Sequence, residues 1–216
     1  INNPLASILV NMELLVGEAK DPAQLESLQA IKVEADRAAQ IVRNLLTYVR
    51  GQGSERAVVD LRDAVRGALA LRRNQLLSQQ IEVSADLPAE PVLVWGNTIN
   101  LQQVLMNLVT NAADAIGEVP VRIRITTTLA DLDRAYLDQA LQGQELQPGS
   151  YAVMEVHDSG CGMSPEVMSR IFDPFFTTKP AGHGLGLSAI LGILRGHHAG
   201  LRIYSEPGRG STFKVL

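Results

Sequence analysis

The feature that most constrains this chain is the stretch from residue 158 to residue 187, where an acidic residue lies close to two glycine-rich turns. Asp158 follows the apolar, strand-like run 151–156 and precedes Gly160 and Gly162. The second turn precedes the apolar run 187–194 and contains Gly182, Gly184 and Gly186. Glycines before a helix let backbone N–H groups approach phosphate oxygens, and the helix N-terminus favours the anion. Either cluster alone would more often be a surface turn, but together they predict a nucleotide pocket.

Two further segments offer side chains to such a pocket. Phe175 and Phe176, with Lys179 three residues further on, can cover a flat and charged ligand. On the helix-like run 98–116, Asn107 and Asn111 are four residues apart and point the same way, with Asp114 three residues beyond. Two amides on one helix face suit a hard cation that keeps several waters and bridges phosphates, which describes Mg²⁺. Alone, two such asparagines would more often be solvated or capping, but beside the glycine turns they favour a metal-nucleotide site.

The first 50 residues show helical spacing of apolar residues. One run follows Pro4, and a second follows Asp21 and Pro22, which are typical of a helix start. Two helices with one apolar stripe each cannot enclose a core, so we expect dimerisation into a four-helix bundle. The alternative is that both helices pack on the following domain. The stripe residues are Leu5, Ile8, Leu9, Met12 and Leu15 (or Val16), then Leu25, Leu28, Ile31, Ala35, Ala38, Ile41 (or Val42), Leu45 and Val49.

The sequence Gly-Gln-Gly-Ser at residues 51–54 predicts a linker, and after it the pattern becomes mixed α and β. We expect the polar segment 131–148 to be a loop with a helical turn. The order of the elements predicts an α+β fold, with helices on one face of a mixed sheet. Strands are predicted at 81–85, 92–95, 121–126, 151–157, 201–205 and 211–216. Helices are predicted at 61–77 after Asp60, at 98–116 after Asn97, from Ser164 and Pro165, and at 187–194.

Composition limits the possible partners and compartments. A net charge of −4 and a pI near 5.6 give no electrostatic reason to expect nucleic acid or an anionic membrane. The one cysteine, Cys161, excludes an internal disulfide framework and suits a reducing compartment. No apolar run approaches the length of a membrane span, and no signal peptide is present. Because the chain starts without Met and stops inside the apolar run 213–216, we expect it to be a piece of a longer protein.

These motifs resemble the core of a bacterial sensor histidine kinase, in which a dimerisation helix hairpin precedes an ATP-binding domain of the Bergerat fold. Asn107 and Asn111 match the N box of that family, and residues 1–5 resemble the end of its H box. The other boxes are matched by Asp158, Gly160 and Gly162, by residues 172–176, by Gly182, Gly184 and Gly186, and by residues 208–213. The resemblance implies a dimerisation hairpin at 1–50, a linker at 51–54 and an ATP-binding α/β sandwich at 55–216.

By this resemblance the chain is a protein-histidine kinase that binds Mg-ATP. It would transfer the γ-phosphate to a histidine on the dimerisation helix and then to an aspartate of a response regulator. Asp158 would accept a hydrogen bond from the adenine amino group with Ser211 nearby, Asn111 would hold Mg²⁺, and Asn107 would orient the phosphates. The other implied nucleotide contacts are Asp114, Gly160, Gly162, Phe175, Phe176, Lys179, Gly182, Gly184, Leu185, Gly186 and Leu187.

The resemblance also implies partners. These are a second copy of the chain and the receiver domain of a response regulator. Asn3 stands where the family has a Thr or Asn implicated in dephosphorylating that regulator. The implied location is cytoplasmic, and any attachment of the parent protein to a membrane is expected through parts outside this chain.

The chain departs from the family pattern in two places. The phospho-accepting histidine is expected two residues before Ile1, and none of His157, His183, His197 and His198 has the context of an acceptor. Only Pro-Ala-Gly-His separates Lys179 from Gly184, so the lid over the nucleotide is expected to be very short.

Two rival functions remain. The same fold occurs in gyrase-like and chaperone ATPases, which place a glutamate general base four residues before the asparagine that binds Mg²⁺. Here that position is Asn107, and an amide cannot deprotonate water. The second rival is a dimeric scaffold that binds nucleotide without catalysis, against which the intact glycine turns and both asparagines count.

Overall fold

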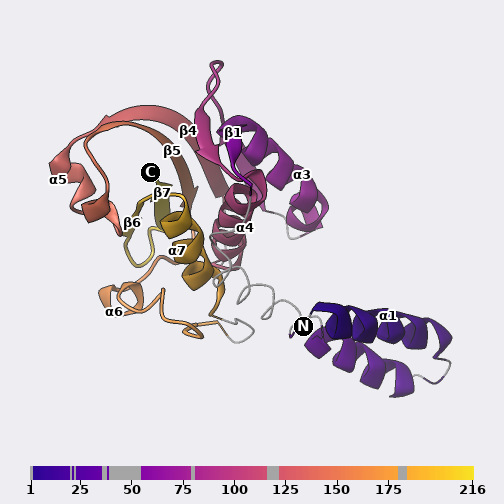
Figure 1. Ribbon diagram of the computed structural model, residues 1–216. Helices are drawn as coiled ribbons and strands as arrows, with labels where there is room; N and C mark the ends of the chain where they lie inside the picture. The colour runs from indigo at the N-terminus through magenta and orange to yellow at the C-terminus, as the bar shows by residue number, and fades with distance from the viewer. Residues whose placement is uncertain are drawn as a thin grey trace. The chain divides into compact units, whose positions relative to one another are not determined.

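A computed structural model of the chain describes residues 2–19, 21, 23–35, 38, 55–78, 81–115, 122–179 and 184–216 (Figure 1). The chain divides into two compact units, Ile1–Arg50 and Gly51–Leu216. The expected linker at 51–54 lies outside the described residues. Within the part of the chain that the structure describes, no helix is long and apolar enough to cross a membrane.

The first unit is a helical hairpin. Helix α1 (Asn2–Glu18) is followed by a second helical segment at residues 23–35, as the apolar spacing predicts. The Asp21 carboxylate accepts a hydrogen bond from the Ala23 amide at 3.3 Å, and Lys32 forms a 3.2 Å ion pair with Glu13 across the two helices. Met12 is buried, whereas other apolar side chains of the hairpin remain exposed, among them Ile8, Val10, Leu14, Leu15, Ile31 and Val33. The predicted stripe residues after Ala38 lie outside the described residues.

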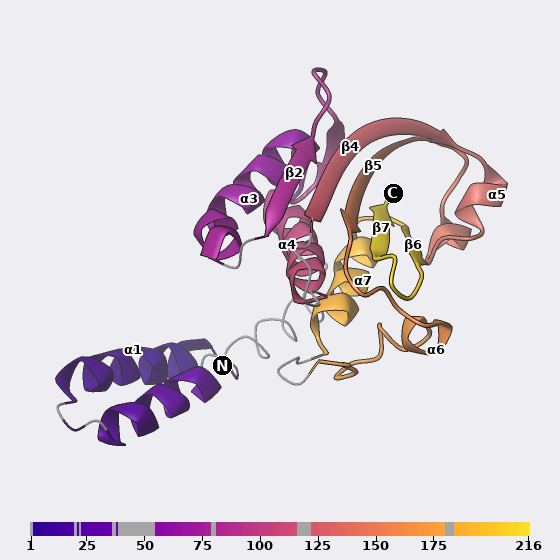
Figure 2. The ribbon, with the colours of Figure 1, turned by 180° about the vertical axis from the view of Figure 1, so that it is seen from behind.

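The second unit contains a five-stranded mixed sheet of strand order β2-β4-β5-β7-β6. Strands β2 and β4 are parallel, and the other neighbouring pairs are antiparallel. Helices α3, α4 and α7 pack together beside the sheet (Figures 1 and 2), and the main core lies between these helices and the sheet, as predicted. The bounds are β2 Glu82–Asp86, β4 Arg122–Leu132, β5 Gly149–Asp158, β6 Leu201–Ser205, β7 Ser211–Val215, α3 Leu61–Ser78, α4 Thr98–Asp114 and α7 Gly186–Gly196.

A separate two-stranded sheet was not fully predicted. It pairs β1 (Ala57–Asp60) antiparallel with β3 (Leu93–Gly96), with Val58 opposite Trp95. The sequence pattern predicts a strand near β3 but none at 57–60, a segment whose strand partner lies more than thirty residues later in the chain. Both Val58 and Trp95 are exposed.

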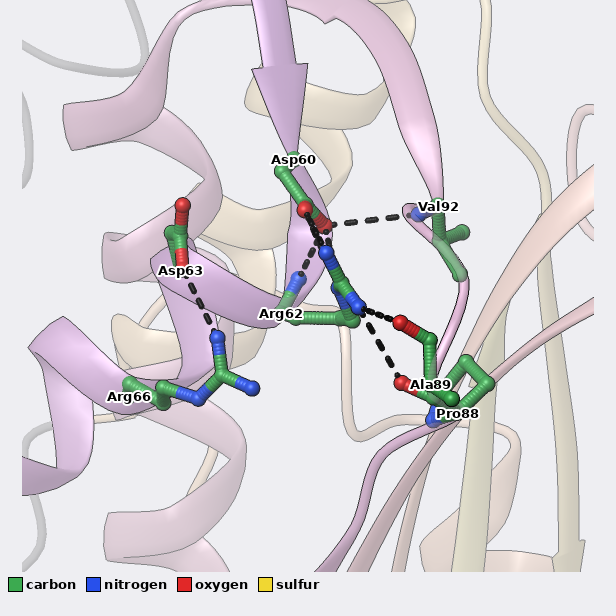
Figure 3. A network of polar contacts seen from close by, with 7 residues as sticks. All are labelled: Asp60, Arg62, Asp63, Arg66, Pro88, Ala89 and Val92. Atoms are coloured by element: carbon green, nitrogen blue, oxygen red, sulfur yellow. Dashed lines mark hydrogen bonds and ion pairs between the residues drawn. The ribbon is translucent and has the colours of Figure 1, made fainter.

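A polar network joins the end of β1 to the start of α3 and to the loop before β3 (Figure 3). Asp60 Oδ1 accepts the backbone amides of Arg62 at 3.0 Å and Val92 at 3.3 Å, so Asp60 caps the helix start as expected. The Arg62 guanidinium donates to Asp60 Oδ1 at 3.1 Å and to Asp60 Oδ2 at 3.0 and 2.7 Å. It also donates to the carbonyls of Pro88 and Ala89. Hydrogen bonding from Arg62 lowers the pKa of Asp60 to about 2.

The segment between β4 and β5 is more ordered than predicted. The predicted loop with a helical turn is present but shorter than 131–148, because β4 continues to Leu132 and β5 begins at Gly149. Between them lie helix α5 (Arg134–Leu137) and the 3-10 turn η1 (Gly143–Glu145). The few apolar residues of this segment pack on the sheet face opposite the main core, since Val153 alternates with Met154 along β5. This second core contains Leu132, Leu137, Ala140, Leu146, Val153 and Leu216.

Candidate nucleotide-binding site

Asp158 is a buried carboxylate at the end of β5, 3% exposed. Its Oδ1 accepts hydrogen bonds from the backbone amides of Gly160 at 2.9 Å and Ser211 at 3.3 Å. None of the residues that the structure describes donates to Oδ2. Burial raises the pKa of Asp158, and the two backbone amides act in the opposite direction. Oδ1 therefore stabilises the turn through these two hydrogen bonds, and Oδ2 can accept a hydrogen bond from a ligand.

The glycines after Asp158 are required by close approaches of the backbone. A Cβ at Gly162 would lie 1.9 Å from the carbonyl oxygen of Glu206, and Gly162 also has a positive φ of 65°. Between the glycines, the Cys161 amide donates to Ala115 O at 3.0 Å, and its carbonyl accepts from Gly208 at 2.7 Å. The turn is thus tied to the end of α4 on one side and to the β6–β7 hairpin on the other.

Ser211 lies where the resemblance implies, beside Asp158. It is buried, and its Oγ lies 3.0 Å from Ser205 Oγ, which in turn binds Gly210 O and the Met163 amide. Ser205 was not among the predicted site residues. It could have been predicted from the hairpin, because the turn at 206–210 places Ser205 opposite Ser211 in the register of β6 and β7.

Helix α4 carries the two asparagines. Asn97 caps the helix, as predicted, by accepting the Asn100 amide at 3.0 Å, and the helix buries Leu101, Val104, Leu105, Leu108, Val109, Ala112 and Ala113. Asn107 Nδ2 donates to the carbonyl of Gly186, the first residue of α7, at 3.1 Å. A Cβ at Gly186 would lie 3.9 Å from Asn111 Nδ2 and 4.0 Å from Asn107 Cγ, so both amides lie at the start of α7.

Among the described residues, none accepts a hydrogen bond from Asn111 Nδ2, although this atom is buried. An unpaired buried amide costs folding free energy, so such a group in a native structure calls for a partner that binds it. The oxygen and nitrogen of an amide have nearly the same shape, and rotation of the group by 180° would place its oxygen at this position. The donor set here therefore fits a cation held jointly by an amide oxygen and by phosphate.

Lys179 is held at the end of α4. Its Nζ lies 3.3 Å from Asp114 Oδ2 and 3.3 Å from the Asn111 carbonyl oxygen. Lys179 and Asp114 side chains are 32% and 48% exposed, so this ion pair is weak and open to exchange for a phosphate. Both side chains thus lie beside Asn111, as the sequence spacing suggested for Asp114.

Phe175 and Phe176 form a turn against Gly184. The Phe175 amide donates to the Gly184 carbonyl at 3.0 Å, and a Cβ at Gly184 would lie 2.3 Å from the Phe175 carbonyl carbon. Gly184 has φ of 63° and Phe175 has φ of 69°. The Phe176 ring packs against the core beneath Arg170, whose guanidinium carbon is 4.3 Å from the ring centroid, while Phe175 is 67% exposed. Among the contacts described, Phe176 is a packing residue, and the ring free to meet a ligand is Phe175.

The start of α7 has the geometry of an anion-binding site. Leu185 is buried ahead of the helix, Ser188 Oγ donates to the Leu185 carbonyl at 3.1 Å, and Leu187 packs on the core. The first amides of a helix have no intrahelical acceptor and face the N-terminal end. Gly182 and His183 lie outside the described residues, and so does the side chain of Asn3.

The structure thus brings the site residues into two groups that meet at Ala115, just after α4. One group surrounds Asp158 with Gly160, Gly162 and Ser211. The other surrounds the start of α7 and includes Asn107, Asn111, Asp114, Lys179, Gly184 and Gly186. Ala115 joins them, because its carbonyl accepts the Cys161 amide and a Cβ at Gly160 would contact it at 2.7 Å. A ligand with a donor at one end and an anion at the other matches this arrangement.

Comparison with known families gives two matches in tandem. Residues 96–216 match the model described as "Histidine kinase-, DNA gyrase B-, and HSP90-like ATPase", and residues 1–54 match the "His Kinase A (phospho-acceptor) domain". The first model covers more than half of the chain, which therefore belongs to that ATPase family. With the phospho-acceptor model ahead of it, the chain is the core of a bacterial sensor histidine kinase.

Similar proteins carry the same two parts within longer chains. The chain is 35% identical to the sensor kinase CckA of Brucella abortus (strain 2308) and 30% identical to the histidine-protein kinase AtoS of Escherichia coli (strain K12), each over 100% of this chain. It spans only 22% of the length of that CckA and 33% of that AtoS.

Solved structures show the same fold. Full-length ShkA, in a complex with AMPPNP, superimposes with a TM-score of 0.75 at 21% identity, covering 99% of this chain and 42% of ShkA. The nucleotide-free catalytic domain of the histidine kinase ThkA gives a TM-score of 0.58 at 26% identity, covering 75% of this chain and 94% of that domain. The ATPase family model supports ATP as the nucleotide of this site.

Proposed function

We propose that the protein containing this chain is a two-component sensor histidine kinase. Residues 55–216 bind Mg-ATP, residues 1–50 form the dimerisation hairpin, and residues 51–54 link them. The γ-phosphate passes to a histidine nitrogen on the dimerisation helix and then to an aspartate of a response regulator. The observation that carries this proposal is a pair of side-chain atoms in the two halves of one site that have no hydrogen-bond partner among the described residues. They are Oδ2 of the buried Asp158 and the buried Nδ2 of Asn111.

Asp158 selects the nucleobase. Its Oδ2 accepts the exocyclic amino group of adenine, a donor that guanine does not present at the same ring position. Gly160 and Ser211 hold Oδ1, so the carboxylate is oriented before ATP arrives. Preorganisation of this kind saves the free energy of ordering the side chain on binding.

Asn111, Asn107, Lys179 and the first amides of α7 hold the phosphates. A bound Mg²⁺ would supply charge neutralisation between the phosphate oxygens. Asn111 is the residue that would hold it, because its amide lies at the start of α7 without a partner. Asn107 fixes the carbonyl of Gly186 and so keeps the first amides of α7 directed toward the phosphate chain. Lys179 exchanges Asp114 for a phosphate oxygen.

Transfer to a histidine is favoured over hydrolysis. Asn107 occupies the position of the general base in gyrase-like relatives, and its Nδ2 donates a hydrogen bond to the Gly186 carbonyl at 3.1 Å. Asp114, the carboxylate on the next turns of α4, is paired with Lys179 at 3.3 Å. With no base directed at a water, ATP waits for a stronger nucleophile, the imidazole nitrogen of the phospho-acceptor helix.

Two partners follow from the first unit. The exposed apolar side chains of the hairpin, such as Ile31 at 54% exposure, are consistent with a four-helix dimer. The phospho-acceptor model over residues 1–54 supports the same arrangement and a receiver domain as the phosphate recipient. Asn3 would then act in dephosphorylation of that receiver.

The proposal is tested by following the γ-phosphate. The chain of 216 residues should release phosphate from ATP at close to background rates with Mg²⁺ saturating. A chain extended upstream of Ile1 to include the expected acceptor should instead become labelled in an acid-labile form, typical of a phosphoramidate. Asn107→Ala should reduce the labelling, and Asp131→Asn, a distant exposed carboxylate, should not. If the chain hydrolyses ATP rapidly and Asn111→Ala abolishes this hydrolysis, the ATPase hypothesis would be favoured and the kinase proposal overturned.

A further inference from the structure

His197 connects the two helices that carry the phosphate-binding side chains. It follows α7 directly, and its Nε2 accepts the backbone amide of Asn97, the N-cap residue of α4, at 3.1 Å. Because a backbone amide can only donate, Nε2 must be the bare nitrogen and Nδ1 must carry the proton. Nδ1 then donates to the carbonyl of Ile193 at 2.8 Å, within the last turn of α7. The ring is therefore a neutral imidazole with a fixed tautomer.

The helices α4 and α7 are antiparallel and are held at both ends. At one end His197 binds Asn97, and at the other end Asn107 donates to Gly186 at 3.1 Å. The two spans, Asn97 to Asn107 and Gly186 to His197, correspond to about 15 Å and about 17 Å of helix at 1.5 Å per residue. Figures 1 and 2 both show these helices side by side, and they are in contact along their length. Neither helix can slide along the other without breaking a bond at one end.

The segment that leads into the second unit is fastened at the same place. Asn97 Nδ2 donates to the Glu55 carbonyl at 2.9 Å, and the Arg56 guanidinium donates to the carbonyl of Gly196. Gly96 lies close to the ring, since a Cβ added at Gly96 would lie only 3.1 Å from His197 Cδ2. The imidazole therefore joins the start of α4 to the end of α7, and residues 55–56 bind the two residues next to that contact, Asn97 and Gly196.

We propose that His197 is a positioning residue for the reaction: it fixes the register of α4 against α7, and so the placement of Asn107 and Asn111 at the phosphate end of α7. The inference rests on the proposed function in taking ATP as the ligand. His197 acts at a distance from the site, through Asn107 about 15 Å along α4 and Asn111 about 21 Å along it. Its bond to α4 requires the neutral ring, because a protonated Nε2 would direct a hydrogen at the Asn97 amide.

A matched pair of variants separates positioning from simple packing. In His197→Gln the amide oxygen can reach the position of Nε2 and accept the Asn97 amide, with the bond to Ile193 lost. In His197→Asn the shorter side chain can donate to Ile193 as Nδ1 does, but it cannot reach Asn97. Each variant loses one hydrogen bond of similar kind, and only His197→Asn loses the one that joins α7 to the start of α4.

Titration with a fluorescent ATP analogue, with Mg²⁺ present, gives the first readout. At pH 7.5 the Gln variant should bind as the wild type does, and the Asn variant should bind about threefold to tenfold more weakly, the effect of one hydrogen bond. Equal binding by the Asn variant and the wild type at pH 7.5 would overturn the proposal.

The NMR signal of the Asn107 side-chain amide gives the second readout, in the chain without nucleotide. This signal should shift in His197→Asn and stay in place in His197→Gln, because only His197→Asn removes the hydrogen bond between His197 and the Asn97 amide. An unmoved signal in the Asn variant contradicts the inference. Failure of the wild type to bind the ATP analogue would contradict the proposed function instead, and the NMR comparison would still decide on His197.

Discussion

Replacing Asp158 by Asn tests the nucleobase contact most directly, because the change is nearly isosteric. In the folded chain two backbone amides, from Gly160 and Ser211, donate to one oxygen of the carboxylate. An Asn side chain has only one oxygen, which must face these two donors. Its NH₂ group then takes the position of Oδ2 and faces the amino group of adenine, donor against donor.

The expected loss follows from that geometry. A hydrogen bond to a charged group contributes about 1.5–3 kcal/mol, and the donor–donor contact adds to the loss. ATP affinity should therefore fall by about tenfold to a hundredfold or more. Folding should not suffer in the same way, because the bonds to Gly160 and Ser211 are retained and a buried charge is removed.

Isothermal titration or a fluorescent ATP analogue measures the affinity, and thermal unfolding measures the stability. Asp131→Asn is the matched control, since Asp131 is an exposed carboxylate at the far end of β4 and the net charge changes equally. If Asp158→Asn binds ATP within about twofold of wild type, less than the smallest loss expected for a charged hydrogen bond, the assignment of Asp158 to adenine is wrong.

The same residue predicts a pH dependence of folding without ligand. Burial raises the pKa of Asp158 above that of an unfolded chain. A carboxyl with a raised pKa favours the folded state when it is protonated, and this contribution is lost as the pH rises through the raised pKa. Asp158→Asn should remove that component from a plot of unfolding free energy against pH, and Asp131→Asn should leave it.

Three further outcomes are expected. Asn111→Ala removes a buried amide nitrogen without a partner, so the ligand-free melting temperature should hold or rise, while the gain in ATP affinity on adding Mg²⁺ should largely disappear; an unchanged Mg²⁺ effect contradicts the metal role. Arg62 lowers the pKa of Asp60 to about 2, so this carboxylate stabilises the fold above about pH 4, and its contribution is lost as the pH falls toward 2. Asp60→Asn should lower the unfolding free energy at pH 7, measured with urea, and should reduce the loss of stability between about pH 4 and pH 2. Ile31→Glu, on the predicted stripe, should shift light scattering toward the monomer, whereas Val33→Glu, exposed but off the stripe, should not, and equal effects would place the dimer interface elsewhere.

Much of the second unit could be predicted from local sequence. The caps at Asn97 and Ser164, and the strands on either side of residues 206–210, follow from side chains and turns within a few residues of one another. Gly162 and Gly184 lie in the glycine turns that the sequence predicts, and both have positive φ in the structure. Local chemistry is sufficient here because the interacting groups are neighbours in the chain.

Other features depended on contacts between distant residues. Strand β1 is defined by pairing with β3 more than thirty residues later, and the second core forms only when the segment 133–148 folds back on the sheet. Neither four residues of alternation nor a sparse set of apolar residues is enough to predict such packing.

The candidate site divides in the same way. The sequence by itself determined which residue types are present: a carboxylate between a strand and two glycines, two asparagines on one helix face, and a glycine turn before a helix. Only the tertiary structure decided that Asn107 binds Gly186, that Asn111 Nδ2 has no hydrogen-bond partner among the described residues, and that His197 joins α7 to the start of α4 across 100 residues. The physical reason is that periodicity shows which face of a helix is polar, whereas the partner of that face depends on how the helices and the sheet pack around a common core.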